Sequence, residues 1–408
     1  MAQTYDHVVI GAGVVGLTCA LELKRRMPRA KVLVLEKEPA PGRHSSGRNS
    51  GVLHSGIYYP PDSLKARVCT AGAVEMAAYC KERGLPLNPI GKLLVPTRVD
   101  DAAQLDLLEA RGAANGVGVR RIDAAELAQI EPSTRSATGE ALFVAQTSVV
   151  SSALVVASIV ADVIAAGIEL RCEGSLDGVI AERRALRWNR EDIHYGHALN
   201  CAGLHADTIA HMFGVGEDVE LLPFKGLYWK LDPQSGIKIN HLIYPVPDLR
   251  VPFLGIHTTT SIEGAVYLGP TSVPAFGREN YHGFQDVGGS ESARIVSALA
   301  SQFAGNRDGF RRLAIQEGPR YFKSRFAAAA RKLLPALRSE HLVPSDKVGI
   351  RAQMLDKVSG RLITDFLVRS GPSSTHVLNA ISPAFTSAFP LARNICDSIF
   401  QAEIYHAN

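Results

Sequence analysis

Residues 8–16 read Val-Val-Ile-Gly-Ala-Gly-Val-Val-Gly, an apolar run that breaks into the pattern G-x-G-x-x-G. The run predicts a buried strand, and the spacing of the apolar residues over 17–23 predicts a helix directly after it. Gly11 permits a tight turn, Gly13 lets the backbone approach a pyrophosphate, and Gly16 lets helix and strand pack closely. The stretch therefore indicates a Rossmann-type unit whose helix N-terminus binds a diphosphate.

A second predicted strand, Lys31–Leu35, is followed at once by an acidic residue. This residue, Glu36, lies 20 positions after Gly16 (36 − 16). An acid at that distance accepts hydrogen bonds from an adenosine ribose and repels a 2′-phosphate. The alternative is a purely structural βαβ start that holds no ligand.

The stretch 39–51 helps to decide which dinucleotide is expected. It is rich in Gly, Ser and Pro, and this composition argues against a regular element. Its hydroxyls, amide and small residues suit the lining of a long buried cofactor, which favours FAD over a nicotinamide dinucleotide. A mobile surface loop is the alternative, but the apolar and aromatic stretch 52–59 that follows argues against it.

Seven further stretches carry a family resemblance: NSGVLHSGIYY (49–59), SLKAR (63–67), PFKGLYWKL (223–231), NHLIYPVPD (240–248), PFLGIH (252–257), GIRAQ (349–353) and SPAFTSAFP (382–390). Through them the chain resembles the D-amino-acid-oxidase-like flavoproteins, and within that group the L-2-hydroxyglutarate dehydrogenases, over essentially its whole length. The resemblance implies oxidation of L-2-hydroxyglutarate to 2-oxoglutarate by hydride transfer from C2 to flavin N5. We expect the FAD to be bound non-covalently, because no cysteine or histidine clearly marks a covalent link.

The expected fold is α/β, with a Rossmann-type FAD-binding domain interleaved with an α+β substrate domain built on a mostly antiparallel sheet. We assign residues 1–85, 146–220 and 345–408 to the FAD-binding domain, and residues 86–145 and 221–344 to the substrate-binding domain. Local patterns predict helices over 101–115, 124–130 and 153–166, and strands over 91–96, 168–172 and 253–256, the last of these ending in His257.

Composition fits a large globular enzyme. The chain has 408 residues, of which 46% are hydrophobic and 21% charged, and its net charge is +4. This charge and the absence of a Lys/Arg-rich run argue against nucleic acid as a partner. We expect six reduced cysteines, no metal site, no targeting segment and a cytoplasmic location. Peripheral contact with the inner face of the membrane stays open, because a quinone is one conceivable electron acceptor.

The residues expected to line the cofactor lie at predicted strand ends and turns, and most are small or polar: Gly11, Gly13, Val14, Val15, Gly16, Glu36, Lys37, Ser46, Asn49, Ser50, Gly51, Gly174, Ala202, Gly203, Ser382, Pro383 and Ala384. The resemblance places the helix after residue 387 with its N-terminus at the flavin O2 edge, where it would stabilise negative charge. The turn before that helix lacks the Gly-His pair of amine-oxidising relatives, which weighs against an amine substrate.

Oxidation of a 2-hydroxy acid needs cations for carboxylates and a base for the hydroxyl proton. Arg351 is the first choice for a carboxylate, and Lys225 is the candidate for a second one. Each has a solvated surface position as its alternative. Tyr59 and Ser382 are further substrate candidates, although aromatic residues in such a run are more often part of the core.

Two histidines are candidates for the base, with His54 slightly favoured over His257. A hydrogen-bonded structural role is the alternative for each of them. The electron acceptor stays open between oxygen, a quinone and a soluble carrier. Three other readings also stay open: an oxidase of another 2-hydroxy acid or an amino acid, a nicotinamide-dependent dehydrogenase, and a non-catalytic dinucleotide-binding module.

Overall fold

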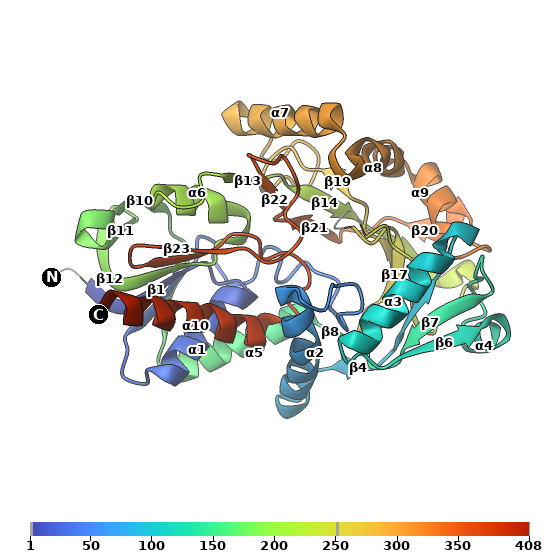
Figure 1. Ribbon diagram of the computed structural model, residues 1–408, viewed down its shortest axis with the longest axis horizontal. Coiled ribbons are helices and arrows are strands. Elements are labelled where there is room, and N and C mark those ends of the chain that lie inside the picture. Colours follow the sequence, from blue (N-terminus) through green and yellow to red (C-terminus); the bar gives the residue numbers. More distant parts are fainter. Residues whose placement is uncertain (1–2, 250–252, 408) are drawn as a thin grey trace. The chain divides into compact units, whose positions relative to one another are not determined.

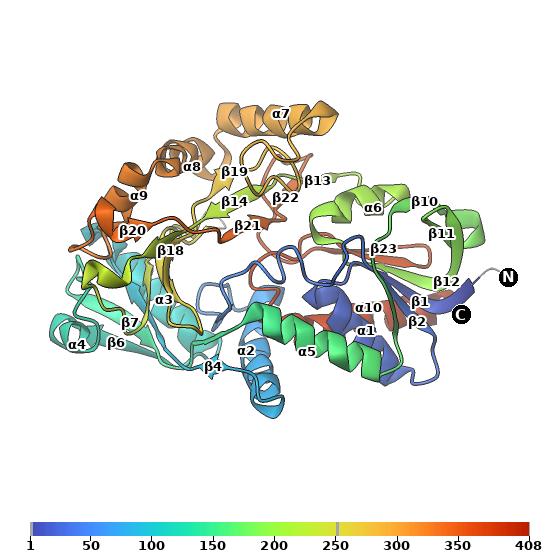
Figure 2. The ribbon, with the colours of Figure 1, turned by 180° about the vertical axis from the view of Figure 1, so that it is seen from behind.

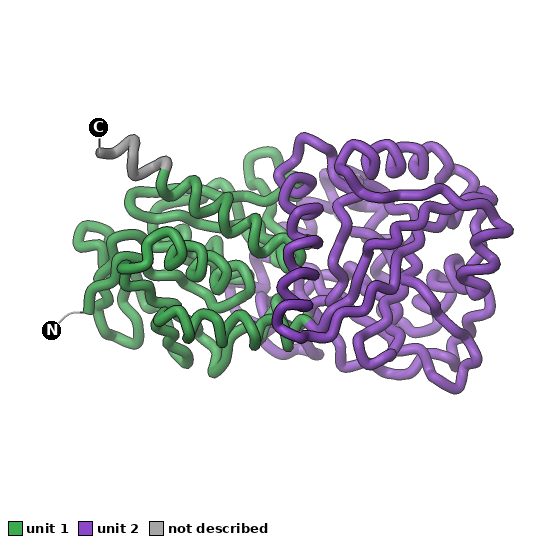
Figure 3. Tube along the Cα trace, turned by 90° about the horizontal axis from the view of Figure 1, so that it is seen from below, with its two compact units in different colours: residues 1–48, 152–222, 352–408 green, residues 49–151, 223–351 purple. Residues whose placement is uncertain are grey.

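The computed structural model describes residues 3–249 and 253–407, with side chains as far as residue 400 (Figure 1). Pro252, which opens the quoted 252–257 stretch, lies outside the described residues. The chain divides into two compact units (Figure 3). Unit 1 comprises residues 1–48, 152–222 and 352–408, and unit 2 comprises residues 49–151 and 223–351.

Unit 1 is built on an eight-stranded sheet of order β10-β11-β12-β1-β2-β9, in which β24 pairs with β12 and β23 with β24. Its strands are β1 (Gln3–Ile10), β2 (Val32–Leu35), β9 (Glu169–Arg171), β10 (Leu176–Ile180), β11 (Ala185–Trp188), β12 (Glu191–Asn200), β23 (Val368–Gly371) and β24 (Ser374–Val377). A separate antiparallel pair is formed by β13 (Val219–Leu221) and β22 (Met354–Asp356).

The centre of this sheet is parallel. Strand β1 lies between β2 and β12, and in this register Ile10 is opposite both Leu35 and Asn200. The Gly11 N–H donates to the Leu35 carbonyl (2.7 Å), and the Cys201 N–H donates to the Ile10 carbonyl (2.8 Å). Three strand ends, and the turns that follow them, therefore meet at one edge of the sheet, where open α/β sheets bind ligands.

The helices of unit 1 are α1 (Val14–Arg26), α5 (Ser152–Ala165), α6 (Ala206–Met212) and α10 (Ala388–Ala407). Helix α1 packs against both α5 and α10, as Figure 2 shows. The apolar side of α5 includes Val155, Val156 and Ile159, all buried, whereas Leu154 is exposed. The helix expected over 153–166 is thus confirmed as an amphipathic helix of this unit.

Unit 2 contains four small sheets: β16-β5-β7-β6, β17-β18-β15-β20, β19-β14-β21 and β3-β8-β4. All their strand pairs are antiparallel except β16 with β5. The strands are β3 (Val52–Leu53), β4 (Leu87–Asn88), β5 (Lys92–Val95), β6 (Val119–Asp123), β7 (Glu140–Val144), β8 (Ser148–Val150), β14 (Phe224–Leu227), β15 (Trp229–Leu231), β16 (Leu242–Pro245), β17 (His257–Thr260), β18 (Val266–Gly269), β19 (Val273–Pro274), β20 (Leu342–Val343) and β21 (Val348–Arg351).

Strand β5 is buried on both faces. Leu93 and Val95 belong to one apolar cluster, and Leu94 belongs to another that includes Tyr58 and Tyr244. Because side chains alternate along a strand, Lys92 lies on the same face as Leu94. A charged residue is therefore placed on the Tyr58–Tyr244 side of a core strand.

The helices of unit 2 are α2 (Leu64–Glu82), α3 (Ala102–Ala114), α4 (Ala124–Ile130), α7 (Gly289–Gly305), α8 (Phe310–Glu317) and α9 (Lys323–Ala330). Helices α7, α8 and α9 follow one another along the chain, in orange tones in Figure 1. None of the helices formed by the described residues is long and apolar enough to cross a membrane.

The mixed α/β fold and the mostly antiparallel second unit confirm the expected fold class, and the expected strand over 91–96 appears as β5. The strand expected over 253–256 is wrong, because β17 begins at His257 instead of ending there. Gly255 adopts φ +76°, a left-handed conformation that interrupts an extended strand. The chain first passes from one compact unit to the other between residues 48 and 49, and the predicted domain boundaries, the first of them at residue 85, stay a prediction.

Candidate active site

The turn between β1 and α1 depends on its glycines. Gly11 adopts φ +104°, and a Cβ there would lie 2.6 Å from the Cys201 carbonyl oxygen. A Cβ on Gly16 would lie 2.0 Å from the Gly11 carbonyl oxygen. A Cβ on Gly13, in contrast, would meet only Ser46 Oγ, at 3.1 Å. Packing thus requires glycine at positions 11 and 16. Gly13, in contrast, leaves the backbone in front of α1 accessible.

Helix α1 begins without a capping side chain and without an acidic residue in its first turn. Its N-cap residue is Gly13. The Val14 N–H donates to Ser46 Oγ (2.9 Å), so the loop after β2 reaches this helix end. Such a helix N-terminus favours an anion through its N–H groups and its dipole.

Glu36 is buried at the end of β2, and its carboxylate accepts two backbone hydrogen bonds. The Ala12 N–H donates to Oε2 (2.8 Å) and the Glu38 N–H donates to Oε1 (3.0 Å). Glu36 therefore connects the end of β2 to the glycine turn. Two carboxylate oxygens have capacity for about four hydrogen bonds, so acceptor sites are left for a ribose.

Several other predicted cofactor residues surround this edge of unit 1. Ala202 and Gly203 follow β12, and the fully buried Asn200 accepts from the Ala202 N–H (3.1 Å). Lys37 is largely exposed and forms an ion pair with Glu38. Packing explains the glycine at position 174, because a Cβ there would lie 2.1 Å from the Trp188 ring.

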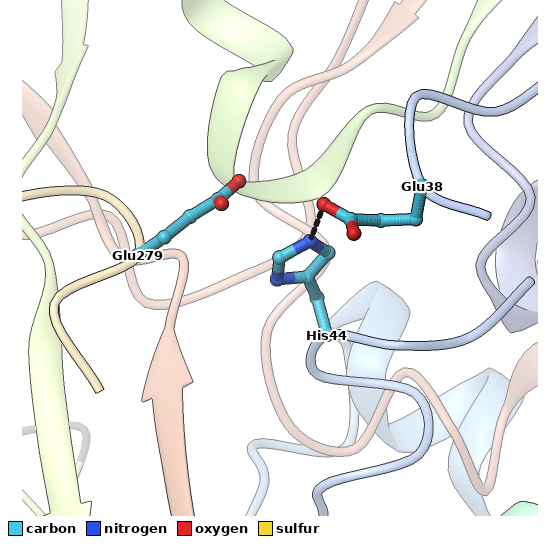
Figure 4. A group of neighbouring side chains, drawn as sticks. All are labelled: Glu38, His44 and Glu279. Carbon is cyan, nitrogen blue, oxygen red and sulfur yellow. Dashed lines mark hydrogen bonds and ion pairs between the residues drawn. The ribbon is translucent and has the colours of Figure 1, made fainter. Parts of the chain in front are cut away.

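The loop 39–48 is held by specific contacts. Figure 4 shows His44 turned toward Glu38, with Nε2 at 3.0 Å from Oε1. The contact with Lys37 and the hydrogen bond from His44 lower the pKa of the Glu38 carboxyl, and burial opposes this shift. His44 therefore lies beside the end of β2, within the stretch 39–51 that is expected to line the cofactor.

The C-terminal turn 381–387 leads into α10. Pro383 and Ala384 are buried, whereas Ser382 is exposed. The Ser387 N–H donates to the Pro383 carbonyl (3.0 Å) just before the helix starts. These three predicted residues belong to unit 1, and Asn49, Ser50 and Gly51 belong to unit 2, so the predicted cofactor set includes residues of both units.

A second constellation lies entirely within unit 2 and centres on His257. This histidine is buried, and its Nδ1–H donates to the Gly255 carbonyl (2.9 Å). The other nitrogen, Nε2, is then the acceptor of the neutral ring. The ring also stacks on Tyr244, with centroids 3.8 Å apart and planes 15° apart. Position and tautomer are therefore both set.

The pKa of His257 is lowered to about 3, mainly by burial and also by the electrostatic influence of His54, Arg351 and Lys92, while the hydrogen bond to Gly255 opposes the shift. Burial also lowers the pKa of His54 to about 3, helped by the charge of Lys92. Both imidazoles are thus neutral at pH 7. The electrostatic couplings place the four groups in one neighbourhood, and the sequence had identified three of them.

Arg351 ends β21 and is opposite Phe224 of β14. Its Nη1 donates to the Thr271 carbonyl (3.2 Å), and its guanidinium carbon lies 5.4 Å from the centre of the Phe253 ring. Burial lowers the pKa of Arg351, while Tyr228 and Glu317 act in the opposite direction. No carboxylate forms an ion pair with Arg351 within the described part of the chain.

Lys92 is the residue that sequence reasoning missed. Its side chain is fully buried, and its Nζ lies 4.7 Å from the centre of the Tyr58 ring and 5.4 Å from that of Tyr244. Among the described residues Nζ has no hydrogen-bond partner. The available signal was a lysine that opens the apolar strand Leu93–Val95, but alternation alone does not reveal which face of that strand points to the histidines.

Two predicted substrate residues are not among these four coupled groups. Lys225 is opposite Ile350 in the β14–β21 pair, so its side chain is on the other face from Arg351, and its Nζ donates to Asn280 Oδ1 (2.8 Å). Tyr59 faces Lys65, whose Nζ lies 5.6 Å from the ring centre. The neighbouring Tyr58 is the tyrosine that contacts Lys92.

Similarity to known proteins extends over the same length as these features. The family DAO, FAD dependent oxidoreductase, matches residues 6–398. A protein named L-2-hydroxyglutarate dehydrogenase from Indibacter alkaliphilus is 36% identical, and the match covers 96% of this chain and 98% of that protein. The protein of the same name from Escherichia coli K12 is 35% identical over 97% and 93%. The human mitochondrial one is 34% identical over 98% and 89%.

Solved structures agree on the fold. L-alpha-glycerophosphate oxidase from Mycoplasma pneumoniae, solved with FAD bound, superposes with a TM-score of 0.74 at 20% identity, covering 97% of this chain and 94% of that one. L-proline dehydrogenase from P. horikoshii gives a TM-score of 0.69 at 17% identity, covering 98% and 95%. The sequence match, the glycine turn with Glu36 and the shared fold lead to one conclusion: the chain belongs to the DAO family of FAD-dependent oxidoreductases.

Proposed function

We propose that this protein oxidises L-2-hydroxyglutarate to 2-oxoglutarate. The relatives that are 33–36% identical over nearly their full length carry the name L-2-hydroxyglutarate dehydrogenase. The structural observation that carries the proposal is a neutral, oriented imidazole at His257, electrostatically coupled to the guanidinium of Arg351. A base and a carboxylate-binding cation are the two protein groups that oxidation of a 2-hydroxy acid requires.

His257 is the proposed base, in preference to His54. Its Nδ1–H is committed to the Gly255 carbonyl, so Nε2 is available to accept the proton of the C2 hydroxyl. Its pKa of about 3 in the free protein is low for a base. An anionic substrate beside Arg351 and Lys92 would offset their charges and raise that pKa, so the base would gain strength when substrate binds.

Arg351 is the proposed receptor for the C1 carboxylate. A guanidinium presents two parallel donors to a carboxylate, and this geometry fixes orientation as well as charge. The Thr271 carbonyl holds one of its nitrogens, and the Phe253 ring lies against the group. A substrate bound through its C1 carboxylate to Arg351 would direct the hydroxyl on C2 toward His257.

The unit 1 edge fits FAD. The backbone in front of α1 is open at Gly13, the helix N-terminus carries no acid, and the Glu36 carboxylate retains acceptor capacity. We propose that Gly11–Gly16 and Ser46 hold the diphosphate, and that Glu36 holds the adenosine ribose. The turn 382–384 before α10 is the proposed partner of the flavin ring. When bound, FAD supplies the two-electron acceptor for the hydride that leaves C2.

A hydroxy-acid dehydrogenase also requires an electron acceptor that regenerates the oxidised cofactor. The proposal includes three chemical classes: a membrane quinone, a soluble carrier and oxygen. A quinone would require the protein to work at the cytoplasmic face of the membrane. Reoxidation rates of the reduced enzyme with each class of acceptor separate the three.

The test of the proposed function is product formation by the holoenzyme with an artificial electron-accepting dye. L-2-hydroxyglutarate should yield one 2-oxoglutarate for each two electrons that the dye receives. Arg351→Ala should retain FAD but lower kcat/KM by about 10²- to 10³-fold, because a buried charge-assisted pair is removed. Arg120→Ala, on the exposed side of β6, should behave as the wild type. Turnover of other 2-hydroxy acids or amino acids without 2-oxoglutarate formation would contradict the proposal.

A further inference from the structure

Lys92 combines two features that rarely occur together in a protein core. Its side chain is fully buried, and its Nζ has no hydrogen-bond partner among the residues that the structure describes. A buried ammonium is costly unless it is paired, and an apolar side chain of similar size would normally serve the core better. The unmet capacity of Lys92 for three hydrogen bonds therefore points to a ligand from outside the chain.

Among the residues that the structure describes, no carboxylate pairs with Nζ of Lys92. Tyr58 and Tyr244 present ring faces at 4.7 Å and 5.4 Å, which favour a cation but accept none of its protons directly. Burial lowers the pKa of Lys92, and the nearby Cys69 thiol of α2 opposes this shift. Lys92 is thus enclosed by aromatic walls and lacks the carboxylate that its charge would normally attract.

Lys92 also belongs to the same electrostatic neighbourhood as the proposed catalytic groups. Its charge acts on both His54 and His257, whereas the charge of Arg351 acts on His257. The two cations come from different sheets of unit 2, β5 in one and β21 in the other. His257 is therefore influenced by two separate positive groups, an arrangement suited to a molecule with a carboxylate at each end.

We propose that Lys92 binds the distal carboxylate of a dicarboxylate 2-hydroxy acid and thereby sets the preference of the site for dicarboxylates over monocarboxylates. This inference rests on the proposed function and deepens it. Arg351 binds the carboxylate next to the reacting carbon, and Lys92 binds the other carboxylate. Lys225 is the second cation expected from the sequence, but its Nζ donates to Asn280 Oδ1. Its side chain also lies on the face of the β14–β21 pair opposite to that of Arg351.

The variant Lys92→Met tests this assignment with two matched substrates. L-2-hydroxypentanoate has the same five-carbon chain as L-2-hydroxyglutarate but ends in a methyl group. The ratio of kcat/KM for hydroxyglutarate to that for hydroxypentanoate should fall by about 100-fold, mainly through a higher KM for the dicarboxylate. Lys65→Met, at another buried lysine beside a tyrosine, should leave the ratio unchanged.

An unchanged ratio in Lys92→Met, or an equal loss with both substrates, would overturn the inference, because equal loss indicates a role in proton transfer or folding. A wild-type enzyme that ignores L-2-hydroxyglutarate would instead contradict the proposed function itself. The two failures are therefore distinguishable. Removal of an unpaired buried charge should not lower the melting temperature, and a melting curve of the variant checks this.

The role of Lys92 can also be tested in the wild-type enzyme, so that the test does not depend on the folding of a variant. Burial lowers the pKa of Lys92 to about 8, whereas burial raises those of Tyr58 and Tyr244 and keeps His54 and His257 neutral. Calorimetric binding of 2-oxoglutarate to the holoenzyme should therefore weaken by up to about tenfold per pH unit above pH 8. Binding of 2-oxopentanoate, measured in parallel, should not weaken in this way. Equal pH dependence of the two ligands, or no binding of 2-oxoglutarate at all, would contradict the assignment.

Discussion

His257 owes its proposed role to one hydrogen bond. Because Nδ1–H donates to the Gly255 carbonyl, Nε2 remains the acceptor of the neutral ring, and the stacked Tyr244 ring fixes its plane. The pKa of His54 is also low, because burial and the charge of Lys92 both disfavour protonation. The His54 side chain is half-buried. Both rings are therefore neutral, and the contacts of His257 fix its tautomer and its plane.

His257→Ala should lower kcat by about 10²- to 10⁴-fold while FAD stays bound, because general-base catalysis is lost. His54→Ala should lower it much less. The wild-type kcat/KM should not decline between pH 7 and pH 5 through His257, because a folded pKa of about 3 keeps the ring neutral down to that range. Stopped-flow flavin reduction across pH measures both effects. A larger loss in His54→Ala than in His257→Ala would move the base to His54.

Sequence reasoning identified some of these residues and missed others for a physical reason. Arg351 and His257 were identifiable because a charged or polar residue stands at the end of a short apolar stretch. Lys92 and Lys225 each lie on an apolar strand too, and the pattern alone does not show which face of the strand meets the histidines. The strand pairing is needed to tell the two lysines apart. The β5–β16 pair places Lys92 beside the histidines, and the β14–β21 pair places Lys225 on the face away from Arg351.

At the scale of elements, the glycine turn and α1 form the most predictable part of the chain. Gly16→Ala should abolish FAD binding and destabilise unit 1, because the new methyl group would lie 2.0 Å from the Gly11 carbonyl oxygen. Gly178→Ala, on β10 of the same sheet, meets no atom within 4 Å and is the matched control. Fluorescence titration with FAD and a melting curve measure the outcome. Full FAD affinity in Gly16→Ala would contradict the close packing of α1 on β1.

The β12–β24 pair makes stability depend on pH. His197 Nε2 lies 3.0 Å from Thr375 Oγ1, and burial, with the charges of His7, His376 and Arg184, lowers the pKa of His197 from 6.5 to about 4. Above pH 6.5 the ring is neutral in both the folded and the unfolded chain. As the pH falls from 6.5 toward 4, only the unfolded chain takes up the proton, so folding stability declines.

His197→Gln should therefore flatten the loss of stability between pH 6.5 and pH 4. The expected difference is on the order of 3 kcal/mol at the acid end, at about 1.36 kcal/mol per pKa unit. Urea unfolding at a series of pH values measures it, with exposed His282→Gln as the control. An identical slope in wild type and His197→Gln would show that His197 does not carry the effect.

Helices were predicted well where apolar residues recur at helical spacing. The expected helices over 101–115 and 124–130 appear as α3 and α4, within a residue of their predicted limits. The expected strand over 253–256 failed because a single glycine, Gly255, turns the chain. Apolar composition alone cannot distinguish a strand from an apolar loop that is buried by its neighbours.

At the scale of the molecule, the chain alternates between the two units. Unit 1 is assembled from three segments and unit 2 from two, and the first change occurs at residues 48 and 49. The division of labour between an FAD-binding and a substrate-binding domain, with the predicted boundaries, stays a prediction.

The central claim is that a protein with bound FAD takes a hydride from C2 of L-2-hydroxyglutarate. Anaerobic mixing of the purified holoenzyme with L- and D-2-hydroxyglutarate, followed by the visible flavin spectrum, tests it most directly. We expect rapid and complete bleaching of the flavin with the L enantiomer and none with the D enantiomer. A preparation that neither carries nor takes up flavin, or a flavin that stays oxidised in the presence of the L enantiomer, would contradict it.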